Sequence, residues 1–148
     1  MTFTEATPSD IPELCELLAV LFSQEAEFVP NREAQCKGLD LIIGNPQAGH
    51  ILVARENGRV AAMVNLLYTV STALGARVAL LEDLVVLPDI RGSGIGSRLL
   101  EYAIEFARIH GCKRITLLTD QDNEPAQRFY QRHGFTVSPM IPFRLSIS

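Results

Sequence analysis

The sequence of 148 residues predicts a mixed α/β (α+β) domain with about 6–7 strands in a central, mostly antiparallel sheet and about four helices on its two faces. Three observations favour this class. Two β-patterned segments flank a tight-turn signal near residue 57, so they pair locally. A strand, a loop, a helix and another strand follow between residues 77 and 118, in the order of a β-α-β crossover. Two short β-patterned segments end the chain. We therefore expect one domain over residues 1–148.

The first third of the chain alternates between strand and helix signals. A short strand is predicted at residues 2–6. Apolar residues then recur at steps of three and four, which predicts a helix over residues 11–23. A second helix is predicted over residues 32–43, because a Gly-Asn-Pro sequence follows directly and ends it.

The middle of the chain has the signals of a hairpin and a long strand. Residues 50–55 alternate between apolar and polar side chains, and residues 60–69 form the return strand. Between them, Asn57 and Gly58 tolerate the positive φ angles of a type I′ turn. After a second turn, residues 77–87 form a long apolar strand that we expect at the centre of the sheet.

The last third returns to helical periodicity and then to strands. A helix begins at Ile95, with apolar residues at steps of three and four. A strand is predicted at residues 114–118. A helix that opens at Asp122 or Asn123, with a proline in its first turn, is predicted to end at His133 and Gly134. Two short strands are predicted to complete the sheet, at residues 135–137 and 143–147.

Composition and charge exclude several classes of protein. Hydrophobic residues make up 47% and charged residues 20%, which is the ordinary range of globular domains. A net charge of -4 argues against a nucleic-acid partner. The three cysteines, Cys15, Cys36 and Cys112, are odd in number and not closely spaced, which argues against a disulfide framework and against a zinc site, so we expect buried or idle thiols and no metal. No signal peptide and no membrane-spanning run is evident, which predicts a cytoplasmic protein without a membrane partner.

A glycine-rich turn separates the long strand from the helix at Ile95. Pro88 ends the strand because it cannot donate to a ladder. Three glycines then alternate at Gly92, Gly94 and Gly96. Glycines let the backbone approach a ligand, and the first N–H groups of a helix are unpaired and carry partial positive charge. The order strand, glycine turn, helix therefore predicts a phosphate-binding site.

Two familiar phosphate-binding motifs do not fit this turn. A P-loop requires Gly-Lys-Ser/Thr at the helix start, but Ser97 and Arg98 follow the glycines here. A dinucleotide fingerprint requires Gly-x-Gly-x-x-Gly near the front of the chain. Gly92 and Gly94 match it, but the third position is Ser97 and the motif lies in the second half of the chain. A nucleotide-binding protein of another fold is therefore disfavoured.

The pattern that fits is Arg-x-x-Gly-x-Gly, residues 91–96. It resembles the acetyl-CoA pyrophosphate loop of the GNAT N-acetyltransferase superfamily. The preceding Leu-Glu-Asp-Leu-Val-Val strand and the later segment from Asn123 to Phe135, which contains Asn-Glu-Pro and Phe-Tyr, strengthen the resemblance. It covers residues 78–137 most closely. In detail, Leu-Glu-Asp and Asn-Glu-Pro are similar to the diamine (spermidine/spermine) acetyltransferase branch.

The resemblance implies where acetyl-CoA, the expected co-substrate, would bind. In the family, the strand before the loop diverges from the next strand, and the pantetheine arm pairs with its free edge. The implied cofactor-binding residues are Leu84, Val85 and Val86 on the strand, Arg91, Gly92, Ser93, Gly94, Ile95, Gly96 and Ser97 in the loop, and Asn123 and Tyr130 further on. Capping of the last helix is the alternative role of Asn123, and the two roles are compatible.

Two acids interrupt the apolar strand, Glu82 and Asp83. A buried carboxylate is costly unless it is paired, hydrated or functional. By resemblance, we assign Glu82 as the general base or the anchor of its water, and both acids to binding of the amine. Strand alternation sends them to opposite faces, unless a bulge, common in the family at this point, upsets the parity. The alternative is an ion pair with an arginine such as Arg77 or Arg114.

The remaining roles also rest on the resemblance. Tyr130 lies where the family places the acid that protonates the departing thiolate. Glu27 and Phe28, in the connection after the first helix, are expected to meet the amine, with solvated surface charge as the alternative for Glu27. The sequence thus predicts an acetyl-CoA-dependent N-acetyltransferase that moves an acetyl group to a primary amine by direct attack in a ternary complex. The alternative is a non-catalytic CoA-binding module or sensor. Family members often pair through sheet edges, which is compatible with a homodimer.

Overall fold

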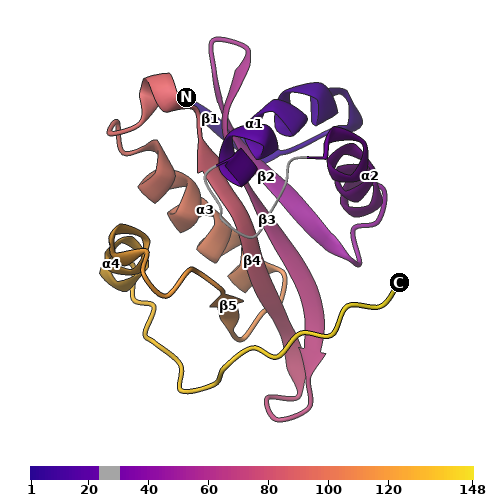
Figure 1. Ribbon diagram of the computed structural model, residues 1–148, viewed down its shortest axis with the longest axis vertical. Coiled ribbons are helices and arrows are strands. Elements are labelled where there is room, and N and C mark those ends of the chain that lie inside the picture. Colours follow the sequence, from indigo (N-terminus) through magenta and orange to yellow (C-terminus); the bar gives the residue numbers. More distant parts are fainter. Residues whose placement is uncertain (24–30) are drawn as a thin grey trace. The chain divides into compact units, whose positions relative to one another are not determined.

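The computed structural model describes residues 1–23 and 31–148 (Figure 1). Two compact units make up the chain, Met1–Leu118 and Thr119–Ser148, and each is described by itself. The prediction of one domain over residues 1–148 stays a prediction. The elements in order are β1 (Thr2–Glu5), α1 (Ile11–Ser23), α2 (Arg32–Ile43), β2 (Gly49–Glu56), β3 (Arg59–Ser71), β4 (Ala76–Val86), α3 (Ile95–Ile109), β5 (Ile115–Leu117) and α4 (Glu124–Arg132), with 3₁₀ turns η1 (Pro8–Asp10) and η2 (Pro88–Ile90).

The strands of the first unit form one mixed sheet in the order β1-β2-β3-β4-β5. Neighbouring strands are antiparallel from β1 to β4, and β5 is parallel to β4. The parallel pair follows from the sequence order, because α3 crosses over between β4 and β5. The prediction of a mixed, mostly antiparallel sheet is therefore confirmed, as is the number of α-helices, which is four in the described residues.

The predicted number of strands is wrong. The described residues contain a sheet of five strands rather than six or seven. The two segments expected as a terminal strand pair, residues 135–137 and 143–147, form no strand. Alternation of apolar residues predicts which face of a strand would be buried, but a strand forms only where a neighbour supplies its hydrogen bonds. That neighbour is a non-local property that the pattern does not contain.

Local turn chemistry fixes the hairpin between β2 and β3. Asn57 and Gly58 both have positive φ, 53° and 74°, which confirms the predicted turn. The turn sets the register of the strands, which pairs Val53 with Met63 and Ile51 with Asn65. Because directly opposed residues share a face of the sheet, this register decides which side chains meet each helix layer.

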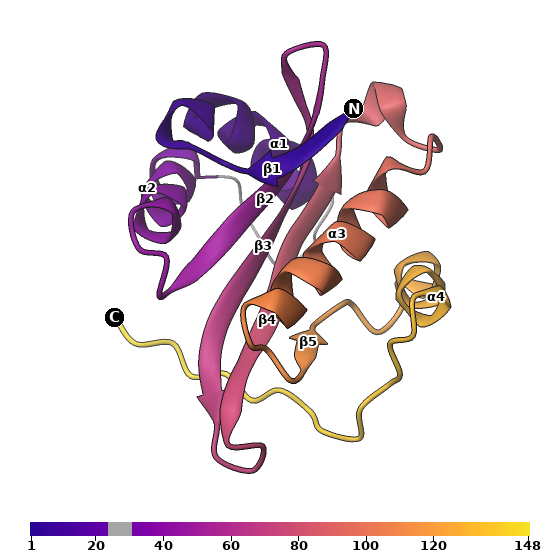
Figure 2. The same ribbon diagram turned by 180° about the vertical axis from the view of Figure 1, so that it is seen from behind.

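Helices cover both faces of the sheet in the first unit, as predicted (Figures 1 and 2). Helices α1 and α2 pack on one face, where a buried cluster joins them to β2, β3 and β4 through Ile51, Val53, Val60, Met63 and Val85. Helix α3 packs on the other face through Ile95, Leu99, Leu100, Ala103 and Ala107. Burial of these apolar stripes is the main stabilising term of the fold.

A disulfide joins Cys15 of α1 to Cys36 of α2. The expectation that these two cysteines are thiols without a disulfide is therefore wrong. Cys15 is fully buried in the cluster under the two helices. The 21 residues between the cysteines bring no spacing signal, because packing of α1 against α2 is what places them together. Disulfides persist in oxidising compartments and are rare in the cytosol, so this bond argues against the predicted cytoplasmic location. That location stays a prediction.

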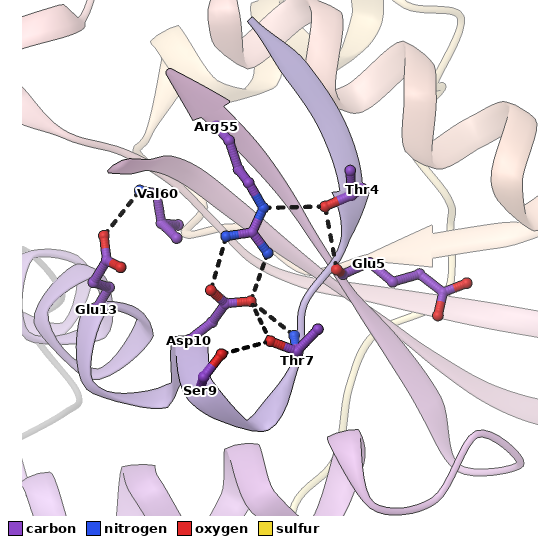
Figure 3. Close-up of polar contacts among 8 residues, drawn as sticks. All are labelled: Thr4, Glu5, Thr7, Ser9, Asp10, Glu13, Arg55 and Val60. Atoms are coloured by element: carbon purple, nitrogen blue, oxygen red, sulfur yellow. Dashed lines mark hydrogen bonds and ion pairs between the residues drawn. The ribbon is translucent and has the colours of Figure 1, made fainter. Parts of the chain in front are cut away.

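Asp10 and Arg55 form an ion pair that ties the start of α1 to β2 (Figure 3). Nη1 and Nη2 of Arg55 donate hydrogen bonds to the two carboxylate oxygens of Asp10 at 2.8 and 2.6 Å. The backbone N–H of Thr7 also donates to Asp10, at 2.7 Å. The hydrogen bond from Arg55 is the main cause that holds the pKa of Asp10 below its usual range, although burial opposes it. The pair therefore anchors the β1–α1 connection on the sheet.

We predict that Asp10→Ala lowers the free energy of unfolding by about 3 kcal/mol, because it leaves a largely desolvated guanidinium without its partner. The side chains of Asp10 and Arg55 are 7% and 27% exposed. Urea denaturation followed by circular dichroism measures the loss. The matched control is Asp89→Ala, which removes an Asp–Arg pair with Arg59 whose side chains are 58% and 52% exposed. That variant should lose little or nothing, since exposed pairs stabilise weakly. Equal losses in the two variants would contradict the assignment.

Candidate active site

The edge of β4 changes character halfway along the strand. In its first half, Ala79 to Leu81 pair with Ile115 to Leu117 of β5. The pairing stops there, and the second half, Glu82 to Val86, has no strand beside it on that edge within the unit Met1–Leu118. Backbone groups on this edge have no ladder partner in that unit and suit an amide-containing ligand, which would bind as an added strand, although the carbonyl of Val86 accepts a hydrogen bond of 3.4 Å from Arg91 Nε. Strand β5 itself ends at Leu117, where the pairing stops, so the divergence of the two strands that the family resemblance implied stays a prediction.

A β-bulge lies where the edge becomes free. The register between β3 and β4 shifts between Met63 and Asn65, so that Asp83 and Leu84 together oppose Val64. Asp83 has a φ of 58°, in the left-handed region that non-glycine residues seldom occupy. Such strain persists only where the surrounding structure imposes it, and it clusters at functional sites. The bulge also changes which way the neighbouring side chains point.

Both acids of β4 lie on the face that α1 and α2 cover. Glu82 pairs directly with Asn65, whose other neighbour, Ile51, belongs to the buried cluster under these helices. The carboxylate of Asp83 accepts a hydrogen bond of 2.7 Å from the side-chain amide of Asn65, so it points to the same face. Simple alternation, which sends the acids to opposite faces, is therefore wrong here, and the bulge is the reason. Glu82 is exposed and Asp83 is half-buried.

The glycine turn lies on the surface between η2 and α3. Gly92 and Gly94 have φ angles of 83° and 84°, and Gly94 is the N-cap residue of α3. Residues 91–94 are exposed. The hydroxyl of Ser93 donates to the carbonyl of Ile90 at 2.6 Å, which closes the turn. The turn that leads into α3 therefore lies on the surface, and burial begins at Ile95, the first residue of the helix.

The start of α3 has the properties of an anion site. Its first turn contains no acidic residue, and its N-cap, Gly94, supplies no side-chain hydrogen bond. The first N–H groups of the helix therefore receive no hydrogen bond from the N-cap side chain, and no acidic residue of the first turn offsets the positive end of the helix dipole. A Cβ atom added to Gly92 or Gly94 would meet no heavy atom within 4 Å, so the space at this end is open. Phosphate groups fit such a helix start.

Two predicted site residues belong to the second unit, Thr119–Ser148. Asn123 is the N-cap of α4, and its side-chain oxygen accepts a hydrogen bond of 3.2 Å from the backbone N–H of Ala126. Tyr130 lies between two rings, with centroids 5.1 Å from Phe129 and 5.7 Å from Phe135. Burial raises the pKa of Tyr130 to about 12, so its hydroxyl stays protonated at neutral pH. The capping role of Asn123 is thus present, and it leaves the amide nitrogen available.

Other candidates are placed differently. Glu27 and Phe28, expected to meet the amine, lie outside the described residues. Arg77, the alternative ion-pair partner of the acids, instead has its guanidinium carbon 4.4 Å from the centre of the Tyr68 ring. Its Nη2 also donates a hydrogen bond of 3.3 Å to Gln47. Arg77 therefore belongs to a polar and aromatic group at the far end of β3.

Asn65 is a residue of this site that sequence reasoning missed. It is 2% exposed and holds the carboxylate of Asp83. The signal was present in the sequence, because Asn65 is the one amide within the otherwise apolar run from Val60 to Leu67. A polar side chain in a buried strand is expected to be hydrogen-bonded for a reason. Only the cross-strand register, however, shows that its partner is an acid of β4.

The comparisons with known proteins agree with this geometry. The model of the Acetyltransferase (GNAT) family matches residues 11–135. The chain belongs to this family. Its members use acetyl-CoA as a co-substrate. The open edge of β4 and the uncapped start of α3 fit the amide-rich arm and the pyrophosphate of such a ligand, by the physical arguments above.

Full-length relatives support the assignment. An uncharacterized N-acetyltransferase of Bacillus subtilis, YhfO, is 32% identical and covers 91% of this chain and 89% of its own. An aminoalkylphosphonate N-acetyltransferase of Salmonella typhimurium is also 32% identical, over 90% of this chain and 83% of its own. A structure from Agrobacterium tumefaciens, provisionally assigned as an acetyltransferase, is 30% identical with a TM-score of 0.82, over 99% of this chain and 100% of its own. These similarities support an N-acetyltransferase and leave the acceptor unspecified.

The described residues also bear on other kinds of site. Within residues 1–23 and 31–148, no helix has the length and apolar character needed to cross a membrane. In the same residues, no three His, Cys, Asp or Glu side chains gather as metal ligands would. The expectations of no metal, no membrane partner and no nucleic-acid partner stay predictions.

We predict that Gly94→Val weakens coenzyme A binding at least tenfold, because the added side chain stands in the space where phosphates would approach the backbone. Isothermal titration calorimetry with coenzyme A measures the change. The matched control is Gly58→Val, at a residue with a φ of 74° whose added Cβ would likewise meet nothing within 4 Å. Both variants carry similar backbone strain, but only Gly94→Val should lose affinity. Full affinity in Gly94→Val would contradict the phosphate assignment.

Proposed function

We propose that this protein is an acetyl-CoA-dependent N-acetyltransferase that transfers an acetyl group to a primary amine by direct attack in a ternary complex. The observation that carries the proposal is that three features follow one another directly along the chain. The free edge of β4 begins at Glu82, the strand leads into the glycine turn, and the turn opens α3. A long ligand with an amide-rich arm and an anionic end matches this order. When bound, acetyl-CoA supplies an activated thioester.

The two acids of β4 have distinct roles in the proposal. An amine attacks a carbonyl only in its neutral form, so a base must take its proton. Glu82 is exposed and can take that proton directly or through a water molecule. Asp83, held by Asn65, would bind the incoming ammonium group. The base and the anchor then lie next to each other on the face covered by α1 and α2.

Tyr130 would assist the departing sulfur. A phenol with a pKa of about 12 is a weaker acid than a thiol, whose usual pKa is about 8.5. Full proton transfer from Tyr130 to the thiolate is therefore unfavourable at equilibrium. A hydrogen bond from the hydroxyl to the developing negative charge remains favourable, and such bonds are stronger than neutral ones. Asn123, on the same unit, would contact the pantetheine arm through its amide nitrogen.

The acceptor is proposed as a primary amine whose ammonium group is bound by acids. The resemblance of Leu-Glu-Asp and Asn-Glu-Pro favours a diamine or polyamine, whereas one relative acts on an aminoalkylphosphonate. The two classes differ in the second functional group, which is cationic in one and anionic in the other. Glu82 and Asp83 and the net charge of -4 favour the cationic class. A cytoplasmic location and a homodimer remain part of the same proposal.

An amine panel with acetyl-CoA tests the function. We expect release of free thiol with certain primary amines, such as 1,4-diaminobutane, spermidine or an aminoalkylphosphonate, and slow background release without an amine. A colorimetric thiol assay measures the rate, and mass spectrometry identifies the acetylated product. Binding of acetyl-CoA without release for any amine would favour the non-catalytic module. No binding of acetyl-CoA at all would overturn both accounts.

We predict that Tyr130→Phe lowers turnover at least tenfold while the KM for acetyl-CoA changes little, because only the hydrogen bond to the departing sulfur is lost. Since the pKa of Tyr130 is about 12, the ratio of wild-type to variant rates should stay constant from pH 7 to pH 9. Tyr102→Phe, which removes a hydroxyl from α3, is the matched control and should keep its rate. A ratio that falls through this pH range would show that the hydroxyl ionises there, against the assignment.

A further inference from the structure

Asn65 carries a polar atom that the fold leaves unpaired. Its side-chain nitrogen donates to Asp83 Oδ2 at 2.7 Å. A carboxylate only accepts hydrogen bonds, so the amide nitrogen must face Asp83 and the amide oxygen must face away. That oxygen is buried and has no hydrogen-bond partner among the described residues. Asn65, which is 2% exposed, thus binds Asp83 through its amide nitrogen and leaves its amide oxygen without a hydrogen bond.

Two unfavourable features therefore meet at one place. An unsatisfied buried acceptor costs free energy, and so does a non-glycine residue with a φ of 58°. The fold shows that it can satisfy a buried polar group fully, because the carboxylate of Asp10 accepts from Arg55 and from Thr7. An apolar residue at position 65 would avoid the first cost. A strained acid held by a half-satisfied amide indicates that the position of the acid matters for something other than stability.

We propose that Asn65 is a positioning residue, which fixes the Asp83 carboxylate on the α1/α2 face as an anchor for the ammonium group of the acceptor. The inference rests on the proposed function and names the substrate-binding geometry of the same site. An ammonium group has three N–H donors and no acceptor. The carboxylate of Asp83, held by the amide nitrogen of Asn65, offers acceptors only, so it complements an ammonium group and disfavours an anionic one.

The variant Asn65→Leu tests the inference by steady-state kinetics. Leucine is similar in size, removes the donor to Asp83 and also removes the unsatisfied oxygen. We expect the KM for the amine to rise about tenfold, as for the loss of a hydrogen bond to a charged group. The KM for acetyl-CoA should stay within about twofold, and the thermal midpoint should not fall. An unchanged KM for the amine would overturn the inference. A lower midpoint with equal changes in both KM values would show a structural role instead.

Met63→Leu is the matched control for the kinetics. Met63 lies on the same strand and, as a member of the buried cluster, on the same face, and leucine preserves its apolar character. This variant perturbs the packing of β3 without touching the polar pair, so both KM values should stay at the wild-type level. A rise in the KM for the amine in Met63→Leu as large as that in Asn65→Leu would overturn the role of the amide.

A binding measurement on the wild-type chain separates this inference from the proposed function. The side-chain amide of Asn65 gives an NMR signal, which should shift when 1,4-diaminobutane is added without acetyl-CoA. A shift in a chain that releases no thiol with any amine would sustain the anchor while the transferase proposal fails. A chain that turns over but shows no shift of this signal would overturn the anchor alone. Neither reading depends on whether Asn65→Leu folds.

Discussion

The site depends on one constraint, the change in hydrogen bonding along β4. This strand pairs with β3 along its length, but β5 pairs with it only as far as Leu81. The bulge at Asp83 follows within two residues, so the strand bends and re-aims its side chains where its second neighbour ends. The end of β5 thus leaves a free backbone edge on one side of β4, and the bulge against β3 brings the two acids to the same face. Neither feature would exist in a regular strand paired on both sides.

The same strand also fixes the length of ligand that can use the site. An extended chain rises about 3.3 Å per residue, so Glu82 and Val86 are separated by at most about 13 Å, and the bulge at Asp83 shortens this span. The glycine turn that opens α3 lies beyond the end of that strand. A phosphate held at the start of α3 would therefore be bound beyond the end of β4, while the acids lie further back along the strand. A long, flexible ligand with its reactive group far from its phosphates is the kind that this spacing admits.

The sequence could predict what depends on neighbouring residues and little of what depends on pairing. The helix Arg32–Ile43 and the turn at Asn57 and Gly58 follow from periodicity, a helix stop and turn chemistry, and both are confirmed. The terminal strands and the idle thiols of Cys15 and Cys36 were wrong, because strand partners and cysteine contacts are non-local. The bulge was foreseen only through the family resemblance. The role of Asn65 needed the register between β3 and β4, which no local pattern contains.

The strain at Asp83 can persist because rigid contacts surround it. Bulged, left-handed backbone relaxes unless its neighbours impose it. On one side, β3 holds β4 through a long ladder. Above the α1/α2 face, the disulfide fixes α1 to α2, and the ion pair of Asp10 with Arg55 fixes the start of α1 to β2. These features are distant from the chemistry, yet they limit how the layer over the acids can move. The contacts that stabilise the α1/α2 layer therefore also help to hold the acids of β4 in place.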